Sequence, residues 1–86
     1  MVDDLYTYEG YQLDIPSYEL SDYDTKLLDT VILMIQYHWS LRETSRNCGG
    51  HKTQLHKNIH TRLRKISFEL YKCCIRVMRE NKSKYF

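Results

Sequence analysis

Residues 40–63 read SLRETSRNCGGHKTQLHKNIHTRL. Ser40 and Glu43 form the S-x-x-E pattern of a capping box, in which each side chain bonds the backbone of the other residue at the start of a helix. That helix must stop at Gly49-Gly50, because consecutive glycines favour a left-handed turn over helix propagation. A further helix is predicted over about residues 52–63, where apolar residues return at helical spacing. The segment therefore has the pattern of a helix-turn-helix.

Apolar residues at three- and four-residue spacing predict one helix before this segment and one after it. The earlier helix begins near Ser21, a good N-cap, with Asp22 and Asp24 close to its positive end. The later helix starts near Ser67. The apolar positions of the two helices are Leu27, Leu28, Val31, Ile32, Ile35 and Trp39 in the first, and Leu70, Cys73, Cys74, Val77 and Met78 in the second. We therefore expect an all-α fold, a small bundle of about four helices that contains the helix-turn-helix.

Composition limits the class of protein. A chain of 86 residues has room for one core, and a deep catalytic pocket is hard to build at this size. The mean hydropathy of −0.62 and the short aliphatic run over residues 31–35 argue against a membrane span. Three cysteines fit a reducing compartment better than a disulfide framework. With no basic, apolar leader at its start, the chain is expected to be soluble and cytoplasmic.

Charge is divided unevenly along the chain. Residues 1–24 hold seven acids and no Lys or Arg, whereas all 13 basic residues follow them. No acid occurs from Thr44 to Phe68. Such asymmetry predicts a polyanion-binding body that carries an acidic arm. The expected organisation is an acidic, tyrosine-rich arm over residues 1–20, a helix-turn-helix domain over 21–82, and a C-terminal tail over 83–86.

Double-stranded DNA is the polyanion that this pattern fits best. In a helix-turn-helix the first helix braces the second, whose exposed face enters the major groove. Lys52, in the first turn, opposes the helix dipole, and this placement is easier to understand beside an external phosphate. The candidates for base contacts are Thr53, Gln54, His56, Lys57 and His60. The candidates for phosphate contacts are Arg42, Arg46, Lys52, Arg64, Lys72, Arg76 and Arg79.

Two further expectations concern the helix over residues 52–63 and the arm. Helical spacing places Thr53, Lys57, His60 and Arg64 on one face. Arg62 projects toward the apolar side, where it is expected to pair with Glu43 or Glu69. The arm is either a disordered, solubilising tail or a segment that folds back over the basic surface and competes with DNA. A short hairpin across its Glu9-Gly10 pair is also predicted.

Residues 25–80 resemble the stage III sporulation protein D family, small bacterial transcriptional regulators with one helix-turn-helix. The likeness runs without gaps through Arg42, Gly49, Lys52, His56-Lys57, Arg62-Leu63, Ile66 and Leu70. It implies sequence-specific binding to duplex DNA in the bacterial nucleoid, with Lys52, Thr53, Gln54, His56 and Lys57 on the recognition helix. The chain departs from the family pattern at Ser45, where alanine is usual, and at Gly50 and His51, which replace an apolar anchor and a serine-like cap.

Other classes of function are less well supported. Cys48, His51, His56 and His60 lie close in sequence, but no C-x-x-C pair completes a structural zinc site, so no metal or other cofactor is expected. No paired carboxylates, Gly-rich phosphate loop or Ser-His-Asp arrangement indicates an enzyme. The main alternative is a protein-interaction adaptor, or a module similar to region 4 of sigma factors that contacts RNA polymerase without itself reading DNA. A monomer and a homodimer both remain open.

Overall fold

The structure, a computed structural model, describes residues 4–84. The described elements, in chain order, are η1 (Asp4–Tyr6), β1 (Thr7–Tyr8), β2 (Tyr11–Gln12), η2 (Ser17–Glu19), α1 (Asp22–Tyr37), α2 (Leu41–Cys48), α3 (Lys52–Asn58), η3 (Ile59–Leu63), α4 (Arg64–Ile66) and α5 (Phe68–Lys84). The predicted all-α bundle is confirmed, with one two-stranded hairpin added at its N-terminal end. Within the described residues, no helix combines the length and the apolar character needed to span a membrane.

Helices α1 and α2 begin at the capping residues that the sequence predicts. Ser21 Oγ accepts from Asp24 N at 3.1 Å, and Ser21 N donates to the Asp24 carboxylate at 3.2 Å. Ser40 and Glu43 make the same reciprocal pair at 3.1 and 3.0 Å. Each pair satisfies backbone N–H groups that a helix start leaves without partners. The two side chains therefore set where each helix begins.

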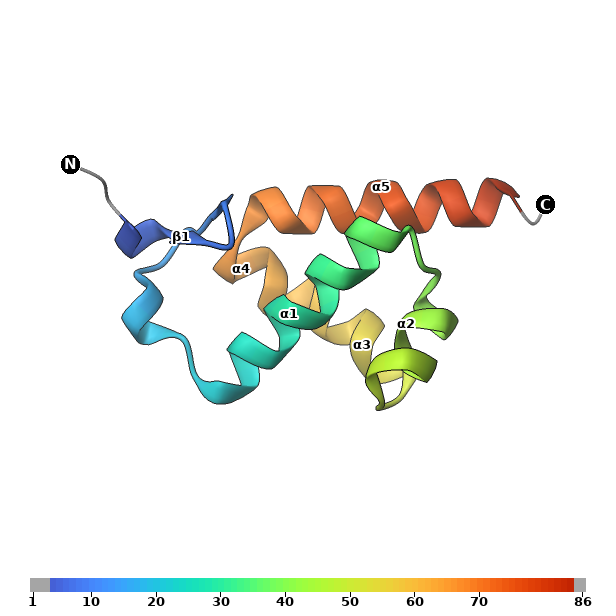
Figure 1. Cartoon of the computed structure of the whole chain (residues 1–86), viewed down its shortest axis with the longest axis horizontal. Coiled ribbons are helices and arrows are strands. Elements are labelled where there is room, and N and C mark those ends of the chain that lie inside the picture. The colour runs from blue at the N-terminus through green and yellow to red at the C-terminus, as the bar shows by residue number, and fades with distance from the viewer. Residues whose placement is uncertain (1–3, 85–86) are drawn as a thin grey trace.

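The core lies where α1, η3 and α5 meet. In Figure 1, α5 runs along one long edge of the molecule, and α1 crosses below it toward the α2–α3 pair. Leu28, Val31 and Met34 of α1 are fully buried there. Their buried partners are Ile59, Leu63, Leu70 and Cys74. This arrangement leaves α2 and α3 at one end of the bundle, supported by the core from one side only.

Elements α3, η3 and α4 form one continuous helical segment over residues 52–66. Asn58, Ile59, Leu63 and Arg64 all have right-handed helical backbone angles. The middle of the segment, η3, is a π-helix, which has more residues per turn than an α-helix. Each residue there advances by a smaller angle, so side chains after Asn58 fall behind the regular helical phase. The segment ends three residues later than the sequence predicts, at the extended residue Ser67.

The N-terminal arm is folded and packed. The predicted hairpin is present, and its turn residues Glu9 and Gly10 both have positive φ, at 51° and 85°, as a type I′ turn requires. Leu13 is 1% exposed and belongs to the core. Asp14 N donates to Ile66 O at 2.7 Å, and the Asp14 carboxylate accepts from Phe68 N at 2.8 Å, which caps α5. The expectation of a disordered tail is therefore wrong for the described residues of the arm.

The arm also does not cover the basic surface. It lies at the end of the molecule opposite α2, against the corner between α4 and α5 (Figure 1). Tyr8 attaches it to α1, because its hydroxyl donates to the Asp29 carboxylate at 2.6 Å. This hydrogen bond, aided by burial and by the nearby negative charge, raises the pKa of Tyr8 to about 12. The arm of one molecule cannot compete with a ligand at the α2–α3 end of the same molecule.

Candidate nucleic-acid interface

Helices α2 and α3 are joined by a turn that depends on two glycines. Gly49 has φ 86° and ψ 167°, and Gly50 has φ 93°. Glycine adopts these angles without the steric cost that a Cβ atom imposes. Gly49 N donates to Ser45 O at 2.8 Å, which closes the last turn of α2. The turn sets the angle at which α3 leaves α2.

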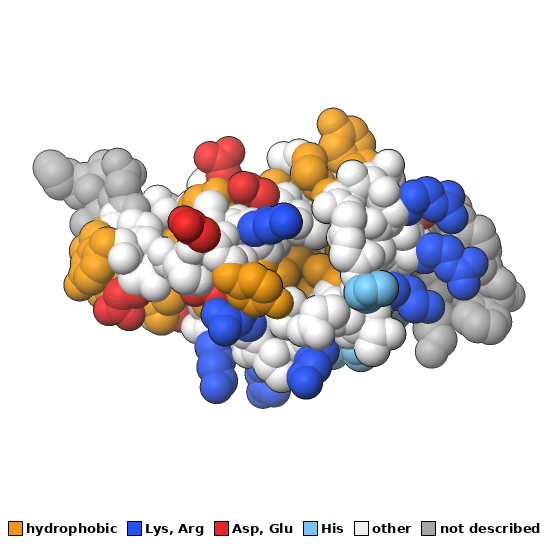
Figure 2. Space-filling view, turned by 90° about the horizontal axis from the view of Figure 1, so that it is seen from below, with side chains coloured by type: hydrophobic (Ala, Val, Ile, Leu, Met, Phe, Trp, Pro, Cys, Tyr) orange, Lys and Arg blue, Asp and Glu red, His pale blue; other side chains and the backbone are white. Residues whose placement is uncertain are grey.

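A row of exposed side chains follows the outer side of residues 52–66. Lys57, Thr61 and Lys65 are exposed and spaced four residues apart, which places them in line along a helix. Thr53 and Gln54 extend the exposed surface toward the start of α3. No Asp or Glu occurs in residues 44–68. We call Thr53, Gln54, Lys57, Thr61 and Lys65 the outer row. Lys and Arg side chains project along the side of the molecule visible in Figure 2.

His60 and Arg64 do not belong to the outer row, which corrects the face predicted by regular helical spacing. His60 is half-buried, and its Nδ1 lies 3.2 Å from the Tyr71 hydroxyl of α5. The Arg64 guanidinium lies over the Tyr71 ring, 5.8 Å from its centroid. Both residues therefore face Tyr71 of α5. His56 is exposed, yet its ring lies 4.5 Å from that of His60 and so borders this side.

Arg62 fixes the segment to the start of α1. Its Nη1 donates to Asp24 Oδ1 at 2.6 Å, and its guanidinium lies 4.9 Å from the centroid of the Tyr23 ring. Burial disfavours the charged Asp24 carboxylate, but hydrogen bonds from Arg62 and Ser21 outweigh burial and lower its pKa. The structural role predicted for Arg62 is confirmed, whereas the predicted partners are wrong.

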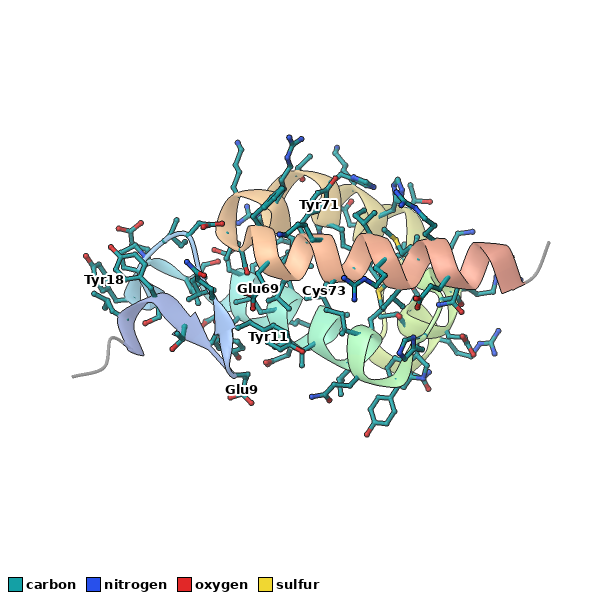
Figure 3. The ribbon with its side chains drawn as sticks, turned by 90° about the horizontal axis from the view of Figure 1, so that it is seen from above. Glu9, Tyr11, Tyr18, Glu69, Tyr71 and Cys73 are labelled. Atoms are coloured by element: carbon teal, nitrogen blue, oxygen red, sulfur yellow. The ribbon has the colours of Figure 1, made fainter. Side chains whose placement is uncertain are left out.

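Both predicted partners of Arg62 are engaged elsewhere. Glu43 completes the capping box of α2. Glu69 accepts a hydrogen bond from Gln12 N at 3.3 Å, and Figure 3 shows it on the side of α5 that faces Tyr11. Glu43 therefore serves the start of α2 and Glu69 binds the N-terminal arm, so neither carboxylate pairs with Arg62.

The remaining predicted phosphate contacts lie in three places. Arg42, Lys52 and Arg79 line one groove between α2, α3 and α5. Lys72 and Arg76 are exposed on α5, and Lys72 lies two residues from both Leu70 and Cys74, which face the core. Since residues two apart point to nearly opposite sides of a helix, Lys72 faces away from the bundle. The structure therefore does not bring Lys72 and Arg76 to the outer row. Arg46 is exposed on α2.

The cysteines offer no described catalytic or metal-binding arrangement. Cys74 is buried, and burial raises the pKa of its thiol to about 12. Cys48 and Cys73 are half-buried. Within residues 4–84, no group of three or more His, Cys, Asp or Glu side chains is placed to hold a metal ion.

Lys65 and Thr61 are surface residues that the sequence-based candidate set omits. Both continue from Lys57 at a spacing of four residues and are exposed. The only sequence signal was the acid-free run that contains both. The face predicted from the sequence followed Thr53, Lys57, His60 and Arg64 instead, and so left Thr61 and Lys65 out.

Comparison with protein-family models, with curated proteins and with solved structures gives no match for this chain. The resemblance to the stage III sporulation protein D family therefore stays a prediction.

Proposed function

We propose that the chain is a sequence-specific double-stranded DNA-binding regulator of transcription, acting in the bacterial nucleoid. The helical segment over residues 52–66 would enter the major groove as the recognition element. The observation that carries this proposal is the acid-free outer row, held on a segment whose opposite side is anchored by the buried residues Ile59, Leu63 and Ile66. A rigid helix with a polar, cationic outer side suits a groove that admits one helix.

The side chains of the outer row match the chemistry of base edges and phosphates. Lys57 and Lys65 can donate to guanine O6 and N7 or to phosphate oxygens, and Gln54 can pair with adenine. The Gln54 side chain is oriented by a hydrogen bond from its Nε2 to Asn58 Oδ1 at 3.2 Å. Arg42, Arg46 and Lys52 flank the start of the segment and suit phosphate contacts. Lys72 and Arg76, on the outer side of α5, are left out of this interface.

Salt-dependent binding to duplex DNA tests the proposal. We would titrate a random-sequence duplex with the full chain, following fluorescence anisotropy at about 50 and 200 mM salt. Several phosphate contacts should make the affinity fall by orders of magnitude between the two conditions. Absence of binding at the lower salt concentration would reject the proposal and favour the protein-interaction alternative.

Two lysine variants locate the interface. Lys57→Ala should weaken binding and change the preferred sequence selected from a random library, because Lys57 faces the bases. Lys72→Ala removes an exposed lysine of the same chemistry from the outer side of α5 and should leave both properties unchanged. Equal losses in the two variants would show that the bound surface is not the outer row.

A further inference from the structure

The N-terminal end of the molecule carries an exposed patch that is both apolar and acidic. Elements η1 and η2 lie against each other there. Leu5 and Tyr6 are each 41% exposed, and Tyr18 is 74% exposed. Glu19 is exposed beside Tyr18. We call these four residues the end patch. Figure 3 shows Tyr18 at the extremity of the molecule, directed away from the helices.

A groove of complementary character lies between α2, α3 and the second half of α5. Its volume is about 1080 Å³. Leu41, Ile75 and Met78 contribute apolar surface to its lining. Among the described lining residues the cations are Arg42, Lys52 and Arg79, and the one carboxylate, Glu43, is engaged in the capping box of α2. An apolar lining with three cations suits an aromatic side chain accompanied by a carboxylate.

The end patch and the groove lie at opposite ends of a molecule 46 Å long. In Figure 2, hydrophobic and acidic side chains lie at the N-terminal end, and Lys and Arg side chains lie along the lower edge and at the opposite end. The arm is fixed by hydrogen bonds to Ile66 and Phe68, so its end patch cannot reach the groove of its own molecule. Only a second copy can bring the two surfaces together.

We propose that the groove binds the end patch of a second copy of this chain, with Tyr18 as the anchor and Glu19 facing Arg42 and Arg79. Tyrosine and arginine are the residues that most often dominate the energy of such contacts. The contact joins two different surfaces of the molecule, so it is heterologous. Copies can therefore add head to tail, and the rotation between neighbouring copies decides whether the product is a closed ring or an open chain.

Two variants test the proposal by complementation. Tyr18→Ser removes the anchor and leaves the groove intact, whereas Arg79→Glu reverses a groove charge and leaves the end patch intact. Both residues are exposed, so both variants should fold. The wild-type chain should associate in sedimentation velocity at about 50 mM salt and less at about 500 mM, where charge is screened over a shorter distance. Each variant alone should lose affinity by about tenfold or more.

Mixing the two variants gives the deciding result. The groove of Tyr18→Ser can still accept the end patch of Arg79→Glu, so the mixture should form heterodimers and nothing larger. Tyr37→Ser and Arg76→Glu are matched controls at exposed residues outside both surfaces, and they should associate like the wild type. A monomeric wild type, or a mixture that stays monomeric, would overturn the proposal. The experiment contains no DNA, so its outcome is independent of the proposed function.

Discussion

The guanidinium of Arg62 donates to the carboxylate of Asp24 across 2.6 Å, joining the candidate recognition segment to the first turn of α1. The Asp24 side chain is 10% exposed and that of Arg62 is 47% exposed. The same carboxylate accepts from Ser21 N, so one residue caps α1 and holds the segment. Truncation of Arg62 would leave this shielded carboxylate without its charged partner.

Arg62→Ala should therefore lower the free energy of unfolding by about 1–2 kcal/mol, a range already reduced for solvent screening of the exposed partner. Urea unfolding at neutral pH measures the change. Arg46→Ala, at an exposed arginine of α2, is the matched control and should stay within about 0.5 kcal/mol of the wild type. Equal stability of the Arg62→Ala variant and the wild type would show that the pair contributes nothing.

The lowered pKa of Asp24 predicts a dependence of stability on pH. Folding lowers this pKa below its usual 3.8, so the stabilisation is complete well above pH 3.8 and is lost as the pH falls through the folded value. Asp24→Asn should remove that part of the acid dependence while lowering stability at neutral pH. Thermal unfolding followed from pH 7 to pH 2 tests this. Parallel curves for the two proteins would contradict the assignment.

Ser45→Ala should stabilise the protein. Ser45 Oγ is buried and has no hydrogen-bond partner among the described residues. Alanine removes the unpaired hydroxyl and favours helix, so the expected gain is about 1 kcal/mol. The midpoint of urea unfolding measures it. A lower midpoint would mean that the hydroxyl makes a contact in solution.

Gly49→Ala should destabilise the protein by about 1–3 kcal/mol, because φ 86° with ψ 167° lies in a region that is essentially restricted to glycine. No atom lies within 4 Å of the added Cβ, so the cost is backbone strain rather than a clash. D-alanine at the same position is the matched control, since its mirror-image preference allows these angles. Semisynthesis by ligation at Cys48 can introduce it. If both alanines destabilise equally, strain is not the cause.

The three thiols should differ in reactivity. Cys74 is buried with a pKa of about 12, so almost none of it is thiolate at neutral pH. An aromatic disulfide reagent should label the half-buried Cys48 and Cys73 first, and Cys74 only at the rate of unfolding. Mass spectrometry of partly labelled protein gives the order. Early labelling of Cys74 would show that α5 opens independently.

Local signals explain which parts of the fold could be predicted. Ser21 and Ser40 bond backbone groups three residues away, so a short stretch of sequence is enough to predict that they cap helices. The Glu9-Gly10 turn is equally local. The packing of the arm is not, because Gln12 and Asp14 bond residues 54–57 positions later. No short stretch of sequence contains both partners of such a bond, so the acidic composition of the arm favoured a disordered tail.

In the candidate site, too, local features could be predicted from the sequence and contacts between distant residues could not. The acid-free run and the glycine turn identified the segment that carries the outer row. Within that segment, His60 and Arg64 contact Tyr71 of α5 and do not share the face of Lys57 as predicted. Arg62 was assigned a structural role from helical spacing, yet its partner Asp24 is 38 residues away. The choice among several carboxylates depends on tertiary packing.

The distant anchoring of the arm has a consequence for synthesis on the ribosome. The chain grows from its N-terminus at about 5–20 residues per second, so Gln12 is made several seconds before Ser67, whose hydroxyl donates to the Gln12 carbonyl. During that interval Leu13 has no core to enter. A chain released before residue 66 lacks Ile66, Ser67, Phe68 and Glu69, which bond Gln12 and Asp14, so its arm is without these bonds and is accessible to proteases. Protease resistance of the arm is therefore acquired only once synthesis has passed Glu69.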